Sequence, residues 1–119
     1  MNNIIERSNE MMMLTSDNFT ETVFTTNYNK LTMVQFTANW CSSCQEFQQT
    51  LDQLMELYPN NTVTFCKVDV DQSPEIADQY QVDKLPTVLF FKERRMVNFI
   101  IGVESIAKFK RIINDILNE

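Results

Sequence analysis

The chain has 119 residues, 44% of them hydrophobic, which is enough for one domain with one core and too short for two. Its 16 Asp and Glu residues outnumber its 10 Lys and Arg residues, giving a formal charge of −6. This balance argues against a nucleic-acid groove and against a surface for anionic lipid. We therefore expect protein partners, and a chain that works as a monomer.

The N-terminal residues carry no sign of a targeting or membrane segment. Charge at Glu6 and Arg7 falls where a secretion signal would carry its apolar core, and no stretch approaches the roughly 20 apolar residues of a membrane span. Residues 1–10 lack a sustained period and are expected to form a tail before a domain of residues 11–119. We expect a soluble, cytoplasmic protein in a reducing compartment, where an oxidised cysteine pair is transient.

The first half of the domain alternates strand and helix patterns. Residues 11–14 form a short apolar run that predicts an edge strand, and Thr15 is the expected N-cap of a helix over about residues 16–28. The nearly uncharged run of residues 31–37 predicts a central strand covered on both faces. A long second helix follows, because apolar residues then recur on one helical face: Phe47, Leu51, Leu54, Met55 and Tyr58.

The second half ends in a hairpin and a helix. Residues 62–70 alternate as a strand, and Ser73-Pro74 predicts the start of a short helix that reaches about residue 80. Two apolar strands, residues 87–91 and 96–101, are close enough to form an antiparallel hairpin. Ser105 is the expected cap of an amphipathic last helix. Strands alternating with helices predict an α/β fold, with a central mixed β-sheet flanked by helices on both faces.

The sequence Trp40-Cys41-Ser42-Ser43-Cys44 stands where a strand pattern passes into a helix pattern. Unpaired N–H groups at a helix N-terminus favour the thiolate form of Cys41, which makes it the candidate nucleophile. Cys44 lies one turn further on the same face, close enough to attack a mixed disulfide formed on Cys41. Trp40 is expected to form a half-exposed apolar wall beside the two thiols.

Other cysteine chemistry fits this composition poorly. A structural zinc site takes four Cys or His ligands, and the chain has no histidine and one further cysteine, Cys66. We therefore predict no metal and no bound cofactor. Cys66 shares a strand face with Val68 and Val70, so a buried, inert thiol is expected there. Three acids, Asp69, Asp71 and Glu104, are expected to be solvated and are assigned no chemistry.

Four landmarks, in order and in spacing, resemble those of the thioredoxin family. They are Phe36-Thr37-Ala38-Asn39-Trp40-Cys41-Ser42-Ser43-Cys44, Lys67-Val68-Asp69-Val70-Asp71, Leu85-Pro86-Thr87 and Gly102. The resemblance implies the thioredoxin fold over nearly the whole chain. It also implies that Pro86 is a cis-proline facing the cysteines, that Leu85 offers backbone groups to a substrate, and that Gly102 lines the substrate groove with Val103.

The sequence departs from the family pattern at two places. Ser42-Ser43 replaces the usual Gly-Pro between the cysteines, which leaves an additional N–H donor and hydroxyl near the sulfurs. Gln35 stands at the position of the family's buried aspartate and has no carboxylate to accept a proton. Lys67, which matches the usual partner of that aspartate, is expected to donate to the Gln35 carbonyl oxygen or to reach water. All four residues are expected to tune the reaction.

These features predict a thiol–disulfide oxidoreductase that reduces disulfides in partner proteins, with Cys41 as nucleophile and Cys44 as resolving thiol. By resemblance, the electron donor is a flavin-containing reductase fed by NADPH. Two alternatives remain. One is a disulfide oxidase or isomerase that uses the same residues, and the other is an interaction module of the same fold in which the thiols are incidental.

Overall fold

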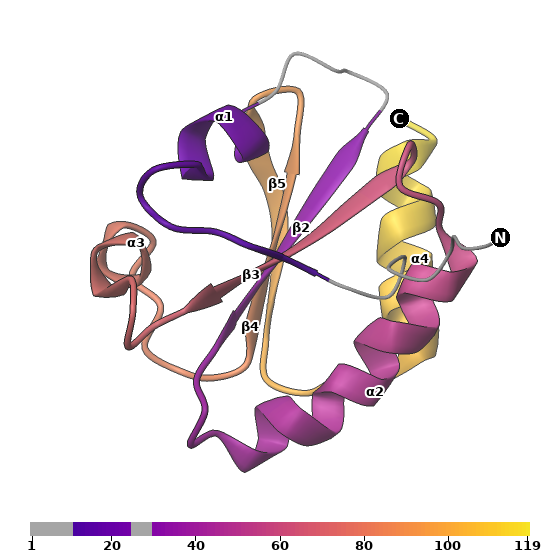
Figure 1. The fold of residues 1–119 in the computed structure, drawn as a ribbon. Helices are drawn as coiled ribbons and strands as arrows, with labels where there is room; N and C mark the ends of the chain where they lie inside the picture. Colours follow the sequence, from indigo (N-terminus) through magenta and orange to yellow (C-terminus); the bar gives the residue numbers. More distant parts are fainter. Residues whose placement is uncertain (1–10, 25–29) are drawn as a thin grey trace, which may run out of the picture.

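The computed structural model describes residues 11–24 and 30–119, which build one sheet with helices on both faces (Figure 1). The sheet has five strands in the order β1-β3-β2-β4-β5. Their bounds are Met12–Met13 for β1, Leu31–Thr37 for β2, Val63–Asp69 for β3, Thr87–Lys92 for β4 and Arg95–Ile101 for β5. The predicted α/β class and mixed central sheet are confirmed, and so is the predicted order of elements.

Strand β2 lies at the centre because it is uncharged and carries apolar side chains on both faces. It pairs in parallel with β3 on one side and antiparallel with β4 on the other, and its first six residues are buried. Leu31 and Met33 point to one core cluster, whereas Val34 and Phe36 point to the other. A strand covered on both faces has no place for charge, which is why the run carries none.

In the part of the chain that the structure describes, four helices cover the two faces of the sheet (Figure 1). Helices α2 (Ser42–Leu57) and α4 (Ile106–Leu117) pack on one face, where Phe47 of α2 and Phe109 of α4 meet at a ring-centroid distance of 5.3 Å. Helices α1 (Phe19–Val23) and α3 (Pro74–Gln79) are short and pack on the other face. No helix in the described part of the chain is long and apolar enough to cross a membrane.

The prediction for the first helix is wrong in its bounds. Helix α1 has Asn18 as its N-cap residue instead of Thr15. The side chain of Asn18 accepts a hydrogen bond from the Thr15 N–H at 2.8 Å, and this local turn delays the start of the helix. The predicted end of the helix, in residues 25–29, lies outside the described residues, as does the predicted tail of residues 1–10.

Strand β4 follows a helix yet runs antiparallel to β2, unlike a simple crossover unit. Thr87 at its start pairs with Phe36, near the end of β2. The segment after α3 therefore returns the chain to the edge where β2 and β3 end. The reversal places Leu85 against the small cluster of Ala38, Cys41 and Cys44.

A hairpin turn and two hydrogen bonds from side chains to the backbone hold β5 and α4 in place. Glu93 and Arg94, with φ of 53° and 69°, form the predicted hairpin turn between β4 and β5. Ser105 caps α4 as predicted, accepting a hydrogen bond from the Lys108 N–H. At the other end of α4, the buried Lys92 ammonium donates to the Ile116 carbonyl at 2.8 Å, which satisfies an unpaired group of the last turn.

Cys66 is the one free thiol among the three cysteines, and it is fully buried in β3. Burial raises the pKa of the Cys66 thiol from 9.0 to about 12, and the opposing effect of Lys30 is smaller. The prediction of a buried thiol on the face of Val68 is confirmed. Since the thiolate is the nucleophile, a thiol this hard to ionise is inert in the folded protein.

Burial of Cys66 makes stability depend on alkaline pH. The unfolded chain releases the Cys66 proton near its ordinary pKa of 9.0, whereas the folded chain holds it to about 12, so ionisation favours unfolding across this window. In the oxidised protein, we expect Cys66 to account for a loss of about 1.4 kcal/mol between about pH 7 and pH 10. Urea unfolding should show this loss in the wild type and lack it in Cys66→Ala. Parallel pH dependences of the two proteins would contradict the expectation.

Candidate active site

The cysteine pair forms a disulfide at the N-terminus of α2. Cys41 is the N-cap residue with extended backbone angles, φ −90° and ψ 99°, and its Cα lies 5.3 Å from that of Cys44. Its sulfur accepts a hydrogen bond from the Cys44 N–H at 3.2 Å. A cysteine sulfur thus occupies the place that a Ser or Asp oxygen takes in most caps, and the positive end of the helix dipole favours negative charge on it.

Both sulfurs are shielded from solvent in the disulfide form. Cys41 is 6% exposed and Cys44 is 2% exposed, and both pack with Ala38 and Leu85. Leu85, in the loop before β4, packs against the pair and contributes to this burial. An apolar shield of this kind keeps water out of the exchange and strengthens electrostatic effects on the sulfurs.

Leu85, Pro86 and Gly102 meet beside the cysteines. The Leu85–Pro86 peptide is cis, as the resemblance implied. The Gly102 N–H donates to the Pro86 carbonyl at 2.8 Å, which fixes the end of β5 against the start of β4. Gly102 has φ +92°, and a Cβ added there would meet no atom within 4 Å, so backbone conformation rather than space requires glycine. The neighbouring Val103 is 55% exposed.

Trp40 stands in solvent beside the disulfide and is 69% exposed. Its indole N–H donates to the Asp71 carboxylate at 2.8 Å. Asp69, two residues earlier, is buried and accepts hydrogen bonds from the backbone N–H groups of Asp71 and Gln72. The expectation that Asp69 is solvated is wrong, and Asp71 has a partner that sequence reasoning missed. An aspartate at the end of a strand, with a second aspartate two residues later, is a sequence signal for such a turn.

The two serines between the cysteines differ in position. Ser42 is exposed, whereas the Ser43 hydroxyl lies 3.4 Å from the Cys41 sulfur. A hydroxyl at this distance can donate to a thiolate as well as to the neutral sulfur. Ser43 is therefore the serine placed to alter the chemistry of Cys41.

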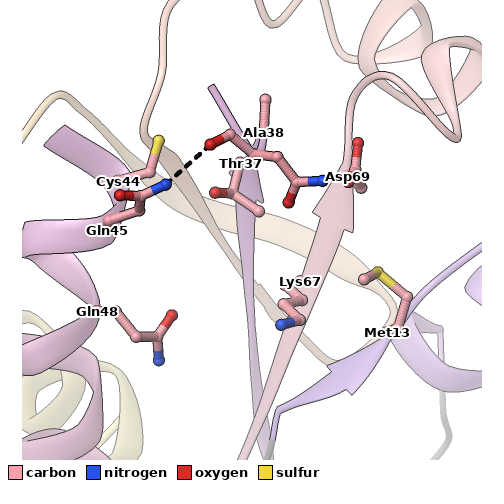
Figure 2. A pocket seen from close by; sticks show the side chains of 9 residues that line it. Met13, Thr37, Ala38, Cys44, Gln45, Gln48, Lys67 and Asp69 are labelled. Atoms are coloured by element: carbon pink, nitrogen blue, oxygen red, sulfur yellow. Dashed lines mark hydrogen bonds between the residues drawn. The ribbon is translucent and has the colours of Figure 1, made fainter. Parts of the chain in front are cut away.

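A pocket of about 270 Å³ opens behind Cys44, between α2 and strands β1, β2 and β3 (Figure 2). The residues around it are Met13, Thr37, Ala38, Asn39, Cys44, Gln45, Gln48, Lys67 and Asp69. Figure 2 shows Gln45 reaching over the pocket, where its side chain donates to the Asn39 carbonyl at 2.8 Å. Two of the lining residues carry charge, Lys67 and Asp69, and both come from β3. The described residues contain no group of acids, cysteines or histidines that could hold a metal ion.

Gln35 of β2 is the strand neighbour of Lys67, one of the residues that line this pocket. It pairs with Lys67 on β3 and with Val88 on β4, and it is 1% exposed. Neither its side-chain nitrogen nor its oxygen has a hydrogen-bond partner among the described residues. Of the two expectations for Lys67, the hydrogen bond to the Gln35 carbonyl oxygen is not found, and the Gln35 amide is buried without a partner beside a charged strand neighbour.

The unpartnered amide of Gln35 should cost stability. A buried polar group without a partner costs about 1–3 kcal/mol, and methionine has a similar shape without the amide. We expect Gln35→Met to raise the free energy of unfolding of the oxidised protein by about 1–3 kcal/mol, as measured by urea denaturation. Thr32→Val, at a buried position of the same strand, serves as a control for repacking. A loss of stability in Gln35→Met would mean that the amide is satisfied in solution.

Comparison with known proteins agrees with this geometry. The family model for thioredoxin matches residues 10–115. Thioredoxin H-type 2 of Nicotiana tabacum is 39% identical over 75 residues, which are 63% of this chain and 62% of that protein, so the match spans about three fifths of the relative. The bifunctional thioredoxin reductase/thioredoxin of Mycobacterium leprae is 33% identical over 89 residues, 75% of this chain and 19% of its own length.

Among solved structures, oxidised mitochondrial thioredoxin 3 of Saccharomyces cerevisiae superposes with a TM-score of 0.78 at 27% identity. The superposition covers 92% of this chain and 99% of the yeast chain. The thioredoxin family model, which matches residues 10–115, spans all nine helices and strands described above except the last two residues of α4. The strand order and the cysteine pair at the start of α2 agree with this family match. Because the family model matches most of the chain, the chain belongs to the thioredoxin family.

Proposed function

We propose that this chain is a thiol–disulfide oxidoreductase that reduces disulfides in partner proteins. One observation carries the proposal: Cys41 and Cys44 form a disulfide in which the Cys41 sulfur is the cap of α2. A disulfide held at a helix N-terminus opens to a dithiol whose first sulfur is stabilised as a thiolate. Membership in the thioredoxin family supports the same activity.

The reaction runs in two exchanges. The Cys41 thiolate attacks one sulfur of the partner's disulfide, forming a mixed disulfide and releasing the partner's other sulfur as a thiolate. The Cys44 thiolate then attacks the Cys41 sulfur, which breaks the bond to the partner. The partner gains two electrons and two protons, and the chain returns to the disulfide form described above. No bound cofactor takes part in either step.

The surface around the disulfide offers a place for the partner chain. Trp40, next to Cys41 in the chain, and Val103, next to Gly102, are exposed apolar residues, and Leu85, which precedes Pro86, packs against the cysteine pair. Gly102 holds this arrangement through its hydrogen bond to Pro86. We assign substrate binding to these five residues, with the backbone of Leu85 pairing with an extended segment of the partner.

The oxidised pair must be reduced again after each turnover, and the chain holds no electron source of its own. We assign this task to a flavin-containing, NADPH-dependent reductase. The Mycobacterium leprae relative supports a reductase partner, since its name joins a thioredoxin reductase and a thioredoxin in one protein. The chain is proposed to act as a monomer in the cytoplasm.

The oxidase alternative rests on the contact between Ser43 and Cys41. A hydroxyl 3.4 Å from the sulfur can stabilise the thiolate, and a dithiol whose reduced form is stabilised is a stronger oxidant. Redox equilibrium with glutathione decides between a reductant and an oxidant. An interaction module with incidental thiols would keep its function when Cys41 is replaced.

The assignment of roles to the two cysteines has a direct test. We expect Cys41→Ser to abolish reduction of insulin disulfides by dithiothreitol above the uncatalysed rate, because the attacking thiolate is gone. Cys44→Ser should instead accumulate a stable mixed disulfide on Cys41, visible by non-reducing electrophoresis and peptide mass spectrometry. Cys66→Ser is the control and should retain activity. Turnover by Cys41→Ser at the wild-type rate would refute the proposed function.

The effect of Ser43 is measured by replacing it with the proline that is usual in the family. Proline is tolerated in the first helical turn and removes both the hydroxyl and the N–H. We expect a wild-type potential less negative than roughly −270 mV, and a more negative value in Ser43→Pro. The exposed Ser42→Ala is the control, with a smaller shift. Titration against glutathione gives both values, and a more oxidising Ser43→Pro would contradict the role of the hydroxyl.

A further inference from the structure

An apolar pocket of about 220 Å³ lies between the end of α3 and strand β5. Thr87 and Leu89 of β4 line it together with their pairing partners on β5, Ile101 and Phe99. Paired residues project from the same face of a sheet, and Leu89 belongs to the core cluster under α1 and α3. The pocket therefore lies on that face, beside the area that the two short helices cover.

Strand β5 exposes three large apolar side chains at this pocket, Met96, Phe99 and Ile101. On the opposite face, Ile100 of the same strand is buried in the core cluster under α2 and α4. The difference arises because α1 and α3 have only five and six residues and do not extend over the last strand of the sheet. Neighbouring apolar side chains that remain exposed mark a surface for interaction.

The α3 side of the pocket is held in a fixed shape. The ring of Tyr80 packs against Phe19 and Phe91, with a centroid distance of 5.7 Å in each pair. The Val82 N–H donates to a carbonyl of α3 at 2.9 Å, and Gln81 before it has a left-handed φ of 57°. A non-glycine residue keeps that conformation where its surroundings require it. The pocket is thus formed before anything binds, which reduces the entropic cost of binding.

The outer edge of β5 is protected against pairing at this pocket. The Gly102 N–H donates to Pro86 and so points to β4. N–H groups alternate in direction along a strand, so the Phe99 N–H points to the outer edge of the sheet. The Asn98 side chain accepts a hydrogen bond from this N–H at 2.8 Å. A strand from a second copy of the chain is therefore disfavoured here, and an occupant binds by a side chain.

The pocket continues the surface that we assign to the partner protein. Thr87 follows Pro86 in the chain, and Ile101 precedes Gly102. Residues along a strand are about 3.4 Å apart, so Phe99 lies about 10 Å along β5 from Gly102. An extended partner segment that passes Gly102 and follows β5 would reach the pocket a few residues from its cysteine.

We propose that the pocket between α3 and β5 is a second subsite for the partner protein, and that it takes a large apolar side chain, aromatic or branched aliphatic, near the attacked disulfide. This inference rests on the proposed function, because it names the class of partner that the same site reduces fastest. Asp83 is the one charged side chain that lines the pocket within the described ranges, and it disfavours an acidic residue there. Partners with a polar side chain at that place are still reduced, but more slowly.

The probes are short serine-rich peptides in which one central cysteine is bonded to 2-nitro-5-thiobenzoate. The Cys41 thiolate attacks the peptide sulfur and releases this coloured thiolate, the better leaving group, so stopped flow gives a second-order rate constant for each peptide. Phenylalanine is placed at each position in turn on either side of the cysteine. We expect one position to react about tenfold faster than the all-serine peptide. Leucine there should retain most of the gain, and glutamate none.

Two variants remove the apolar wall of the pocket at exposed positions. Phe99→Thr keeps a residue that suits a strand, and Met96→Gln keeps the length of the side chain. In each, the advantage of the phenylalanine peptide should fall below about threefold. Leu57→Gln is the matched control, because Leu57 at the end of α2 is 52% exposed and Phe99 is 53% exposed. It should keep the wild-type advantage. Each advantage is a ratio of two peptides on one protein, so a change in thiol reactivity cancels.

The outcomes distinguish the inference from the proposed function, which insulin reduction by the wild type tests by itself. Insulin reduction without a favoured phenylalanine position would overturn the inference and leave the proposed function standing. An advantage that persists in both pocket variants would place the apolar contact elsewhere and would also overturn it. A wild-type dimer that dissociates in Phe99→Thr, seen by analytical ultracentrifugation, would show that a second copy covers the pocket, contrary to the inference. If one pocket variant does not fold, the other decides.

Discussion

The hydrogen bond from the Cys44 N–H to the Cys41 sulfur organises the site. It requires Cys41 to be extended and Cys44 to be helical, so the chain must pass from strand to helix between Ala38 and Ser42. Both sulfurs are thereby set at the edge of the sheet where β2 ends. The same bond turns the N-terminus of α2 toward the sulfur, and the redox chemistry depends on that orientation.

The rest of the site is brought to this edge by the reversal of β4. Because β4 starts where β2 and β3 end, Leu85 packs against the cysteines although more than 40 residues separate it from them in sequence. The end of β5 joins them through Gly102. The site is thus assembled from three chain segments, and its precision depends on the pairing of β2, β4 and β5.

The charges on the face of the sheet under α2 are set by Gln35, Lys67 and Asp69. A neutral, unpartnered Gln35 is buried there next to Lys67, and the one acid of the pocket, Asp69, is held by backbone N–H groups. A carboxylate at position 35 would neutralise the lysine and offer a proton acceptor at the same time. Because position 35 has no carboxylate, the charge of Lys67 in the pocket is not neutralised by a residue at that position.

The sequence alone determined the class of fold, the order of its elements and the cysteine pair, because these depend on local patterns. An uncharged run identifies β2, a proline after serine marks the start of α3, and the spacing of Cys41 and Cys44 places both thiols on one helix face. The tertiary structure decided what depends on contacts between distant segments. The direction of β4, the burial of Asp69, the bond from Trp40 to Asp71 and the isolation of Lys67 are of this kind. Each follows from the pairing and packing of strands that the local sequence does not encode.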